Sequence, residues 1–277
     1  MDILTQKYES LLNLIKKQKS AAVAFSGGVD SSFLCYAAAR ALGEASIAIT
    51  LVSPMLPKTE LQWARRIAAL TGIRHIILED GGIEDAVAEN PKNRCYYCKK
   101  IEFGAIIQAA KENGAFTVMD GSNADDENDY RPGLKAVEEL SVLSPLRECG
   151  FTKDEIRLLS KKASLPTWDK PQAACLASRI PYGERITAQK LKRVEEAEEV
   201  MRNCGFNQFR VRSHGDIARV EVDAKERRLF FNEDFLDALS AGIKKTGFTY
   251  VCFELEGYKT GSLNAPVLEG GYENSAF

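Results

Sequence analysis

The chain has 277 residues, of which 45% are hydrophobic and 27% are charged. This ordinary globular composition excludes a disordered protein and allows roughly two domains of about 100–200 residues each. The 37 basic residues are balanced by 39 acidic ones, and the net charge is −2. This balance argues against a general nucleic-acid binder and against a protein that binds membranes through a basic surface.

No apolar run approaches the roughly 20 residues that a membrane span needs. Residues 1–20 mix charged and apolar side chains at helical spacing and contain no signal-peptide core. We therefore expect a cytoplasmic protein without a membrane partner. In that reducing compartment the seven cysteines would be thiols, metal ligands or reactive groups rather than disulfide partners.

The first part of the chain alternates helical and strand patterns. Helices are predicted at 3–17, 29–42, 59–70, 99–113 and 153–162, and strands at 21–25, 45–52, 73–78 and 116–119. Continuous apolar strands with helices between them indicate a parallel sheet covered on both faces. The sequence thus predicts an α/β domain over residues 1–165, with its ligand crevice beyond the carboxyl ends of the strands.

A second, smaller domain is expected after a loop rich in Pro, Ala and Ser at 166–183. Helices are predicted at 188–203 and 232–245, and strands at 208–212, 218–222 and 249–255. This pattern indicates an α+β domain over 166–263. Residues 264–277 have little periodicity and are expected to form a C-terminal tail.

The segment Ser26-Gly27-Gly28-Val29-Asp30-Ser31-Ser32 joins the first strand to a helix. Its glycines allow a sharp turn and the close approach of a ligand. Free amides at the start of the helix favour an anion such as pyrophosphate. The segment is neither a Walker A loop nor a G-x-G-x-x-G motif. A simple tight turn is the alternative, and the strand–turn–helix context favours the anion site.

Cys95 and Cys98 form a C-x-x-C motif at the start of a helix, and both thiols can reach one metal or cluster from that spacing. Cys175 lies in a loop beside Arg179 and is the third candidate thiol. No second C-x-x-C or C-x-x-H exists, so three thiolates fit an iron–sulfur cluster better than structural zinc. Partly buried thiols are the alternative. The remaining cysteines, Cys35, Cys149, Cys204 and Cys252, are expected to pack as small apolar side chains.

Alternation places Arg210 and Arg212 on one face of a strand, where two guanidinium groups could bind a phosphate or carboxylate. A solvated strand face with salt bridges is the alternative reading. The chain has two histidines. We expect His75 to be structural and His214 to be a hydrogen-bonded turn residue.

The SGGVDSS segment resembles the signature of the PP-loop ATP pyrophosphatase superfamily. Its members share a Rossmann-like fold and cleave ATP to AMP and pyrophosphate while adenylating an oxygen of the substrate. The resemblance implies that Ser26, Gly27, Gly28, Asp30, Ser31 and Ser32 hold the phosphates, and that Asp30 helps to hold Mg²⁺. The segment Gly121–Asp126 resembles a second superfamily loop near the nucleotide, in which a solvated turn is the alternative reading of Asp125 and Asp126.

Further motifs resemble the LarE family over nearly the whole chain. They are RCYYCK around Cys95, DGSNADD, RPG at Arg131–Gly133, SPL at Ser144–Leu146, and CLASRIPYG from Cys175 followed by ERIT. LarE proteins are ATP-dependent sulfur transferases that make the pyridinium bisthiocarboxylate mononucleotide precursor of the nickel-pincer cofactor used by lactate racemase. The resemblance implies a small-molecule pyridinium nucleotide as substrate.

The LarE family has two kinds of member. One sacrifices the sulfur of a single cysteine in the CLASR-like motif. The other carries three cysteines that resemble Cys95, Cys98 and Cys175 and hold a 4Fe-4S cluster. All three are present here, so the resemblance implies ATP, Mg²⁺ and a 4Fe-4S cluster as cofactors, and a sulfur donor as a partner.

The resemblance also implies roles for residues of the second domain. Arg210 and Arg212, with Ser178 and Arg179, would bind the phosphate of the substrate. Glu199 and Glu221 would lie near a metal or the substrate, whereas a third acidic position of the family has no clear counterpart. We also expect a homo-oligomer.

Other functions stay open. A PP-loop tRNA thiolase would need a basic face, which the net charge of −2 does not favour. An amidating ligase, as in NAD or GMP synthesis, leaves the three cysteines without a role. A non-catalytic metal-binding module would tolerate loss of Ser26–Ser32. The preferred hypothesis is an adenylating sulfur transferase, in which a substrate carboxylate attacks the α-phosphate of ATP and a sulfur nucleophile then displaces AMP.

Overall fold

The computed structural model describes residues 2–128 and 133–259. The motif residues Arg131 and Pro132 and the expected tail at 264–277 lie outside the described residues. The chain forms two compact units. The first unit comprises Met1–Gly82 and Asn93–Ala173, and the second comprises Ile83–Lys92 and Ala174–Phe277. The last residue of the first unit is Ala173, and the domain boundary at residue 165 stays a prediction.

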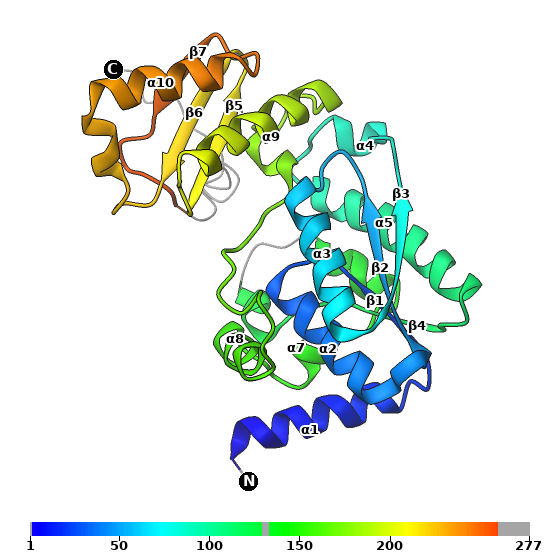
Figure 1. The fold of residues 1–277 in the computed structure, drawn as a ribbon. Coiled ribbons are helices and arrows are strands. Elements are labelled where there is room, and N and C mark those ends of the chain that lie inside the picture. Colours follow the sequence, from blue (N-terminus) through cyan, green and yellow to red (C-terminus); the bar gives the residue numbers. More distant parts are fainter. Residues whose placement is uncertain (1, 129–132, 260–277) are drawn as a thin grey trace. The chain divides into compact units, whose positions relative to one another are not determined.

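A parallel sheet forms the centre of the first unit (Figure 1). Its strands are β1 (Ala21–Ala24), β2 (Ser46–Val52), β3 (Arg74–Glu79) and β4 (Thr117–Met119), in the order β3-β2-β1-β4. All three neighbouring pairs are parallel. Strands of a parallel sheet are covered by helices on both faces, so both sets of their side chains are apolar. This explains the continuous apolar runs, and the predicted α/β class is confirmed.

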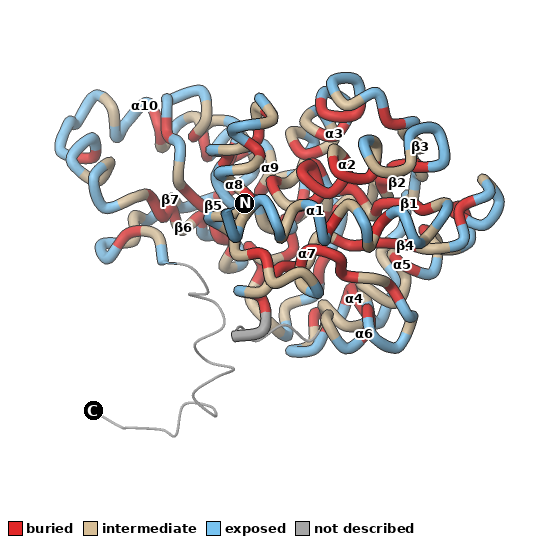
Figure 2. The backbone as a smooth tube through the Cα atoms, turned by 90° about the horizontal axis from the view of Figure 1, so that it is seen from below, coloured by how far each residue is buried: buried red, intermediate tan, exposed pale blue. Residues whose placement is uncertain are grey.

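Helices cover both faces of this sheet. They are α1 (Ile3–Lys16), α2 (Val29–Leu42), α3 (Lys58–Thr71), α5 (Arg94–Glu112), α6 (Gly133–Glu139), α7 (Pro145–Glu148) and α8 (Lys153–Lys162), with 3-10 turns η1 (Gly43–Ala45) and η2 (Ala124–Asn128). One apolar cluster joins the sheet to α1, α2, α3, α7 and α8, and another joins it to α5 and α6. Figure 2 shows β1, β2 and β4 mostly buried, whereas the edge strand β3 is half-buried.

The second unit is smaller and contains its own sheet. Its elements are α4 (Asp85–Ala88), η3 (Leu176–Arg179), α9 (Ala188–Asn203), β5 (Phe209–His214), β6 (Ile217–Val222), η4 (Arg227–Phe231), α10 (Glu233–Lys244) and β7 (Tyr250–Phe253). Strands β5 and β6 are antiparallel, and β6 and β7 are parallel. Helix α9 packs on β5 and α10. The predicted smaller α+β unit is present.

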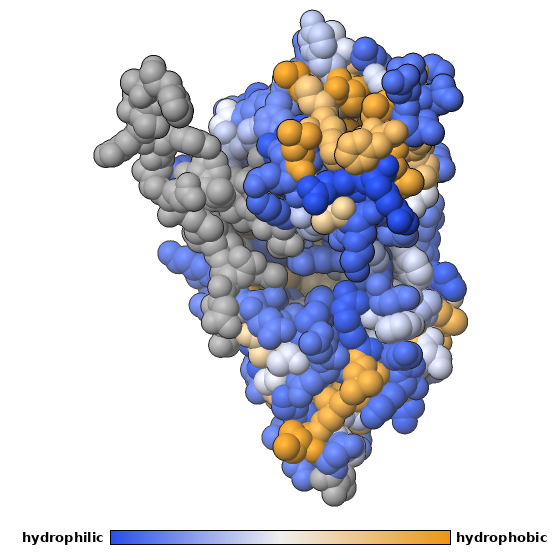
Figure 3. All heavy atoms as spheres, turned by 90° about the vertical axis from the view of Figure 1, so that its left-hand side faces the viewer, coloured by the Kyte–Doolittle hydropathy of each residue, from blue (hydrophilic) through white to orange (hydrophobic). Residues whose placement is uncertain are grey.

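Figure 3 shows hydrophobic side chains gathered on one surface of the second unit. The large exposed apolar residues of this unit are Ile217, Leu229, Phe231, Leu236, Tyr250 and Leu255, and Phe231 is 90% exposed. Surfaces of this kind are typical of contacts with another molecule. Within the described ranges, no helix is both long enough and apolar enough to cross a membrane.

Candidate active site

The segment between β1 and α2 forms a tight loop at the carboxyl edge of the parallel sheet. Gly27 has φ of +76°, and a Cβ on it would lie 2.5 Å from the carbonyl oxygen of Glu60, so only glycine fits. The hydroxyl oxygens of Ser26 and Ser31 are 3.1 Å apart. Gly28 is the N-cap of α2, and no side chain caps this helix. The arrangement therefore suits an anion, as the sequence predicts.

The loop after β4 lies directly beside this first loop, because β1 and β4 are parallel neighbours. A Cβ on Gly121 would lie 3.0 Å from the amide nitrogen of Ser31, so the two loops are in contact. The carboxylate of Asp126 accepts a hydrogen bond from the Asn123 amide at 3.1 Å. Asp126 is buried and shapes the second loop, and its predicted contact with the nucleotide stays a prediction.

Asp30 lies in the first turn of α2 and pairs with Lys153, the first residue of α8. Its second oxygen, Oδ1, is buried and has no hydrogen-bond partner in the part of the chain that the structure describes. A carboxylate oxygen left over in this way suits a hard cation such as Mg²⁺. Lys153 also donates its amide to Asp125 at 2.8 Å, and thereby connects α8 to the second loop.

Helix α5 begins at Arg94, earlier than the predicted residue 99, so the C-x-x-C motif lies inside its first turns. Cys95 and Cys98 are separated by one helical turn and share a face. The hydroxyl of Tyr96 donates to Glu139 on α6 at 2.8 Å, and Lys100 contacts the same carboxylate at 3.0 Å. Helix α6 is therefore bonded to the start of α5, where both thiols are half-buried.

Cys175 belongs to the second unit and is exposed, directly before η3. The Arg179 guanidinium donates to the carbonyl oxygens of Ala174 at 2.7 Å and of Cys175 at 3.2 Å. It also makes two hydrogen bonds, of 2.8 and 3.0 Å, to Glu198 on α9. Arg179 is only 3% exposed. It thus shapes the Cys175 loop, and its binding of a substrate phosphate stays a prediction.

Arg210 and Arg212 share one face of β5, as alternation predicts. Arg210 is buried, and its guanidinium lies 5.0 Å from the ring centre of Tyr258. Burial, together with the positive charge of Arg179, lowers the pKa of Arg210. Arg179 and Arg212 each have a carboxylate partner, Glu198 and Glu221, and binding of a substrate phosphate by Arg210 stays a prediction.

Arg212 holds Glu221 through two hydrogen bonds of 3.0 and 2.9 Å and donates to the Ser178 carbonyl oxygen at 2.8 Å. Glu221 is 1% exposed. Glu199 is exposed and pairs with Arg202 at 2.6 Å. In residues 2–128 and 133–259, no three His, Cys, Asp or Glu side chains form a group suited to a metal ion. The metal roles of Glu199 and Glu221 stay predictions, and their arginine partners count against them.

The two histidines differ from each other. His75 lies in β3, and its Nε2 is 2.8 Å from the hydroxyl of Thr50, which confirms a structural role. His214 is the last residue of β5, and its buried Nε2 has no hydrogen-bond partner among the described residues. The prediction of a hydrogen-bonded turn residue was therefore wrong. Strand β5 continues two residues beyond the alternating pattern, because β6 pairs with it as far as His214.

The cysteines expected to pack also differ. Cys35 is fully buried and Cys149 half-buried, whereas Cys204 and Cys252 are exposed, so the packing prediction was wrong for these two. Cys204 follows the last turn of α9, and Cys252 points outward from the edge strand β7. Side chains alternate between the two faces of a strand, and those on the face of β7 that no other layer covers are exposed to solvent.

Thiol labelling should follow this burial. Folded protein without a bound cluster, treated with iodoacetamide, is expected to be modified first at Cys175, Cys204 and Cys252, while Cys35 remains unmodified. Burial raises the pKa of Cys35 well above its usual value, so little thiolate forms there. Peptide mass spectrometry measures the order of modification, with guanidinium-unfolded protein as the control in which Cys35 reacts. Early modification of Cys35 in folded protein would contradict the described packing.

Three charged residues of the site could not be found from the sequence. Lys153 pairs with Asp30, 123 positions away, and Lys170 with Glu60, 110 positions away. Glu198 pairs with Arg179, 19 positions before it and on another element. Lys153 and Glu198 lie on the highly charged helices α8 and α9, and Lys170 lies in a loop. The helical or strand pattern of a sequence does not distinguish a charged residue with a tertiary partner from one in solvent. The sequence therefore contained no signal for these three residues.

Comparison with known proteins identifies the family. The asparagine synthase family model matches residues 9–125. An uncharacterized protein of Synechocystis sp. is 41% identical, over 95% of this chain and 98% of its own length. The pyridinium-3,5-bisthiocarboxylic acid mononucleotide synthase of Lactiplantibacillus plantarum is 34% identical over 95% of this chain and 96% of its own. A tRNA-specific 2-thiouridylase of Rickettsia felis is 29% identical over 59% of this chain and 55% of its own length. The chain therefore belongs to the LarE family and is a PP-loop, ATP-using enzyme that transfers sulfur with AMP-forming chemistry.

Proposed function

We propose that the protein adenylates a carboxylate of pyridinium-3,5-biscarboxylic acid mononucleotide and converts it to the thiocarboxylate, in the biosynthesis of the nickel-pincer nucleotide. The relative from Lactiplantibacillus plantarum, matched over nearly its whole length, carries this proposal. The loops of the first unit and the three thiols supply the groups that such a reaction needs. The match to a tRNA thiouridylase covers 59% of this chain and supports a tRNA substrate less well.

The first unit would bind ATP. Backbone amides and hydroxyls of Ser26, Gly27, Gly28, Ser31 and Ser32 would hold the phosphates, with Gly121 and Asp126 beside the nucleotide. Asp30 would hold Mg²⁺ through its unpartnered oxygen. A substrate carboxylate oxygen attacks the α-phosphorus, the bond to the bridging oxygen breaks, and pyrophosphate leaves. Catalysis of this step is mainly positioning and neutralisation of charge.

The thiols would hold the cofactor. Cys95 and Cys98, one turn apart on α5, and Cys175 provide three thiolate ligands, which suits a 4Fe-4S cluster with one open iron. When bound, such a cluster would supply the sulfur for the thiocarboxylate. Cys95 and Cys98 belong to the first unit, and Cys175 belongs to the second.

The second unit would recognise the substrate. Arg210 would bind the phosphate of the mononucleotide, with Arg212, Arg179 and Ser178 shaping the surroundings. The seven free thiols suit a reducing compartment, which supports the proposed cytoplasmic location. The exposed apolar side chains of η4 and α10 support a homo-oligomer.

Pyrophosphate release tests the proposed function. Anaerobically reconstituted protein with Mg²⁺ and ATP is expected to release pyrophosphate only when the pyridinium dicarboxylate nucleotide is present. Mass spectrometry should then show oxygen replaced by sulfur in the product. Asp30→Asn should abolish the release, because the metal loses its carboxylate ligand. Release that depends on tRNA, or an amide formed from ammonia, would overturn the proposal in favour of a thiolase or an amidating ligase.

A further inference from the structure

Lys170 belongs to the first unit and lies in the chain segment that follows α8. Its ammonium group is buried against the loop that joins β1 to α2. Its Nζ donates to the carbonyl oxygen of Gly27 at 2.9 Å and to the carboxylate of Glu60 at 2.7 Å. Lys170 is 9% exposed. Burial lowers the pKa of Lys170, and the carboxylate of Glu60 offsets part of this effect. A buried ion pair is weak evidence of a stabilising role, because apolar residues often serve as well.

The peptide between Gly27 and Gly28 is held from two sides. The backbone of α3 approaches Gly27 so closely that a Cβ there would lie 2.5 Å from the Glu60 oxygen and 2.9 Å from the Ala64 nitrogen. Lys170 binds the carbonyl oxygen. The described chain has no cis peptide bond, and in a trans peptide the carbonyl and the next N–H point in opposite directions. The Gly28 N–H therefore points away from Lys170, toward the Ser26 hydroxyl oxygen at 3.4 Å.

We propose that Lys170, held by Glu60, is a positioning residue for the ATP reaction, which fixes the Gly27–Gly28 peptide with its N–H toward the phosphates. Lys170 itself does not touch the nucleotide. Without this bond the peptide can turn over, and a carbonyl oxygen would then face the phosphate oxygens and repel them. The inference rests on the proposed function, in which this loop binds ATP.

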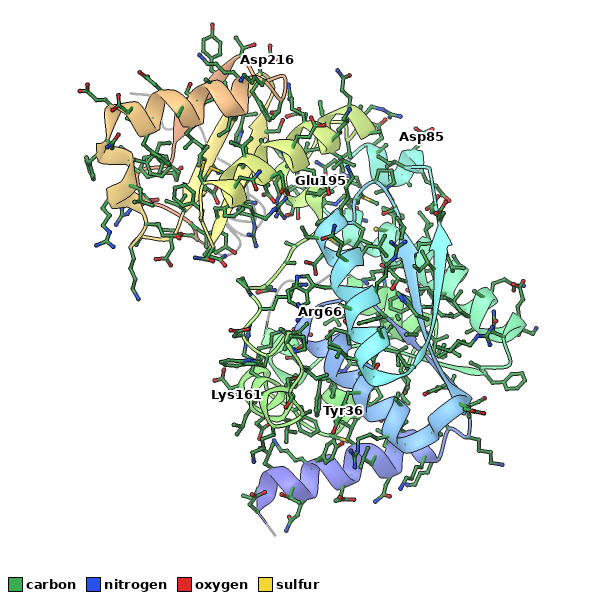
Figure 4. All side chains as sticks on the ribbon, in the orientation of Figure 1. Tyr36, Arg66, Asp85, Lys161, Glu195 and Asp216 are labelled. Atoms are coloured by element: carbon green, nitrogen blue, oxygen red, sulfur yellow. The ribbon has the colours of Figure 1, made fainter. Side chains whose placement is uncertain are left out.

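A neighbouring aromatic ring provides both a probe and a control. Nζ of Lys170 lies 5.4 Å from the ring centre of Trp63, and the guanidinium of Arg66 lies 5.1 Å from the same ring. Figure 4 labels Arg66 on α3. The Gly27 carbonyl accepts from Lys170 and not from Arg66. Arg66→Met is therefore a matched control, since it removes a cation from the ring and leaves the loop untouched.

The experiment separates positioning from stability. Lys170→Met removes the donor to Gly27 and also leaves the buried Glu60 without its ammonium partner, whereas Lys170→Met/Glu60→Met removes both charges. We expect the single variant to lose stability in urea and to raise KM for ATP about 10²-fold, the effect of a small displacement at a reacting site. The double variant should regain stability and keep the raised KM. Lys170→Arg should restore part of the ATP binding.

Trp63 fluorescence supplies an independent readout. In a Trp168→Phe background Trp63 is the sole tryptophan, because the chain has two. In proteins that keep Lys170, with or without Arg66→Met, ATP is expected to change the Trp63 emission at its normal concentration. In Lys170→Met the same change should require about 10²-fold more ATP. Recovery of the KM together with stability in the double variant would overturn the proposal. If Gly28→Ala and Asp30→Ala leave ATP affinity unchanged, the loop is not the ATP site, and the proposed function fails instead.

Discussion

Cys175→Ser is expected to reduce formation of the thiocarboxylate to the background level while pyrophosphate release continues. Serine provides neither a good iron ligand nor a sulfur atom, whereas the loops that would bind ATP lie in the first unit and are untouched. Cys95→Ser and Cys98→Ser should have the same effect. Anaerobic reconstitution with iron and sulfide, followed by visible absorption, iron content and product mass, measures both losses.

Cys204→Ser is the matched control for the cysteine variants. Cys204 is also exposed and belongs to the same unit as Cys175, so its loss should leave the iron content and the product unchanged. A stable cluster in all three variants would contradict the ligand assignment. Mass spectrometry of the protein after turnover should show Cys175 intact, and a loss equal to hydrogen sulfide would mean that Cys175 gives up its own sulfur.

Glu198→Leu is expected to lower the free energy of unfolding by about 3–5 kcal/mol, the usual cost of removing one partner of a buried ion pair. Arg179 would keep its charge at 3% exposure without the carboxylate that it contacts through two hydrogen bonds. Burial tends to raise the pKa of Glu198, but Arg179 lowers it overall. The stabilisation is therefore complete above the usual value of 4.5 and is lost as the pH falls through the folded pKa.

Urea unfolding of matched variants tests this cost. Arg179→Leu/Glu198→Leu should be less destabilised than Glu198→Leu, because no charge is then buried alone. Glu196→Leu on the same helix should cost less than about 0.5 kcal/mol, because Glu196 is exposed and its Lys192 partner is 3.7 Å away. Equal losses in the single and double variants would mean that the pair contributes packing rather than charge neutralisation.

Much of the fold could be predicted from local patterns. The bounds of α2, α8 and α9 agree with their periodicity, and long apolar runs identify β1 and β2. The short helices α4, α6 and α7 were not predicted, since a helix of one or two turns contains too few residues for a periodic signal. The start of α5 was placed too late, because RCYY offers no apolar repeat.

The sequence by itself located the Ser26–Ser32 loop, the Gly121–Asp126 loop and the candidate thiols, since residue type and a strand–turn–helix context suffice for these. It also placed both loops at the carboxyl edge of the sheet. Their contact follows from the strand order, in which β4 is next to β1. Only the tertiary structure showed which charged side chains contact these loops. Lys153 reaches Asp30, Lys170 reaches Gly27, and Glu198 reaches Arg179. The first two pairs join residues 123 and 143 positions apart, and Glu198 and Arg179 are 19 positions apart on different elements. Tertiary packing brings each pair together, which leaves no local pattern in the sequence.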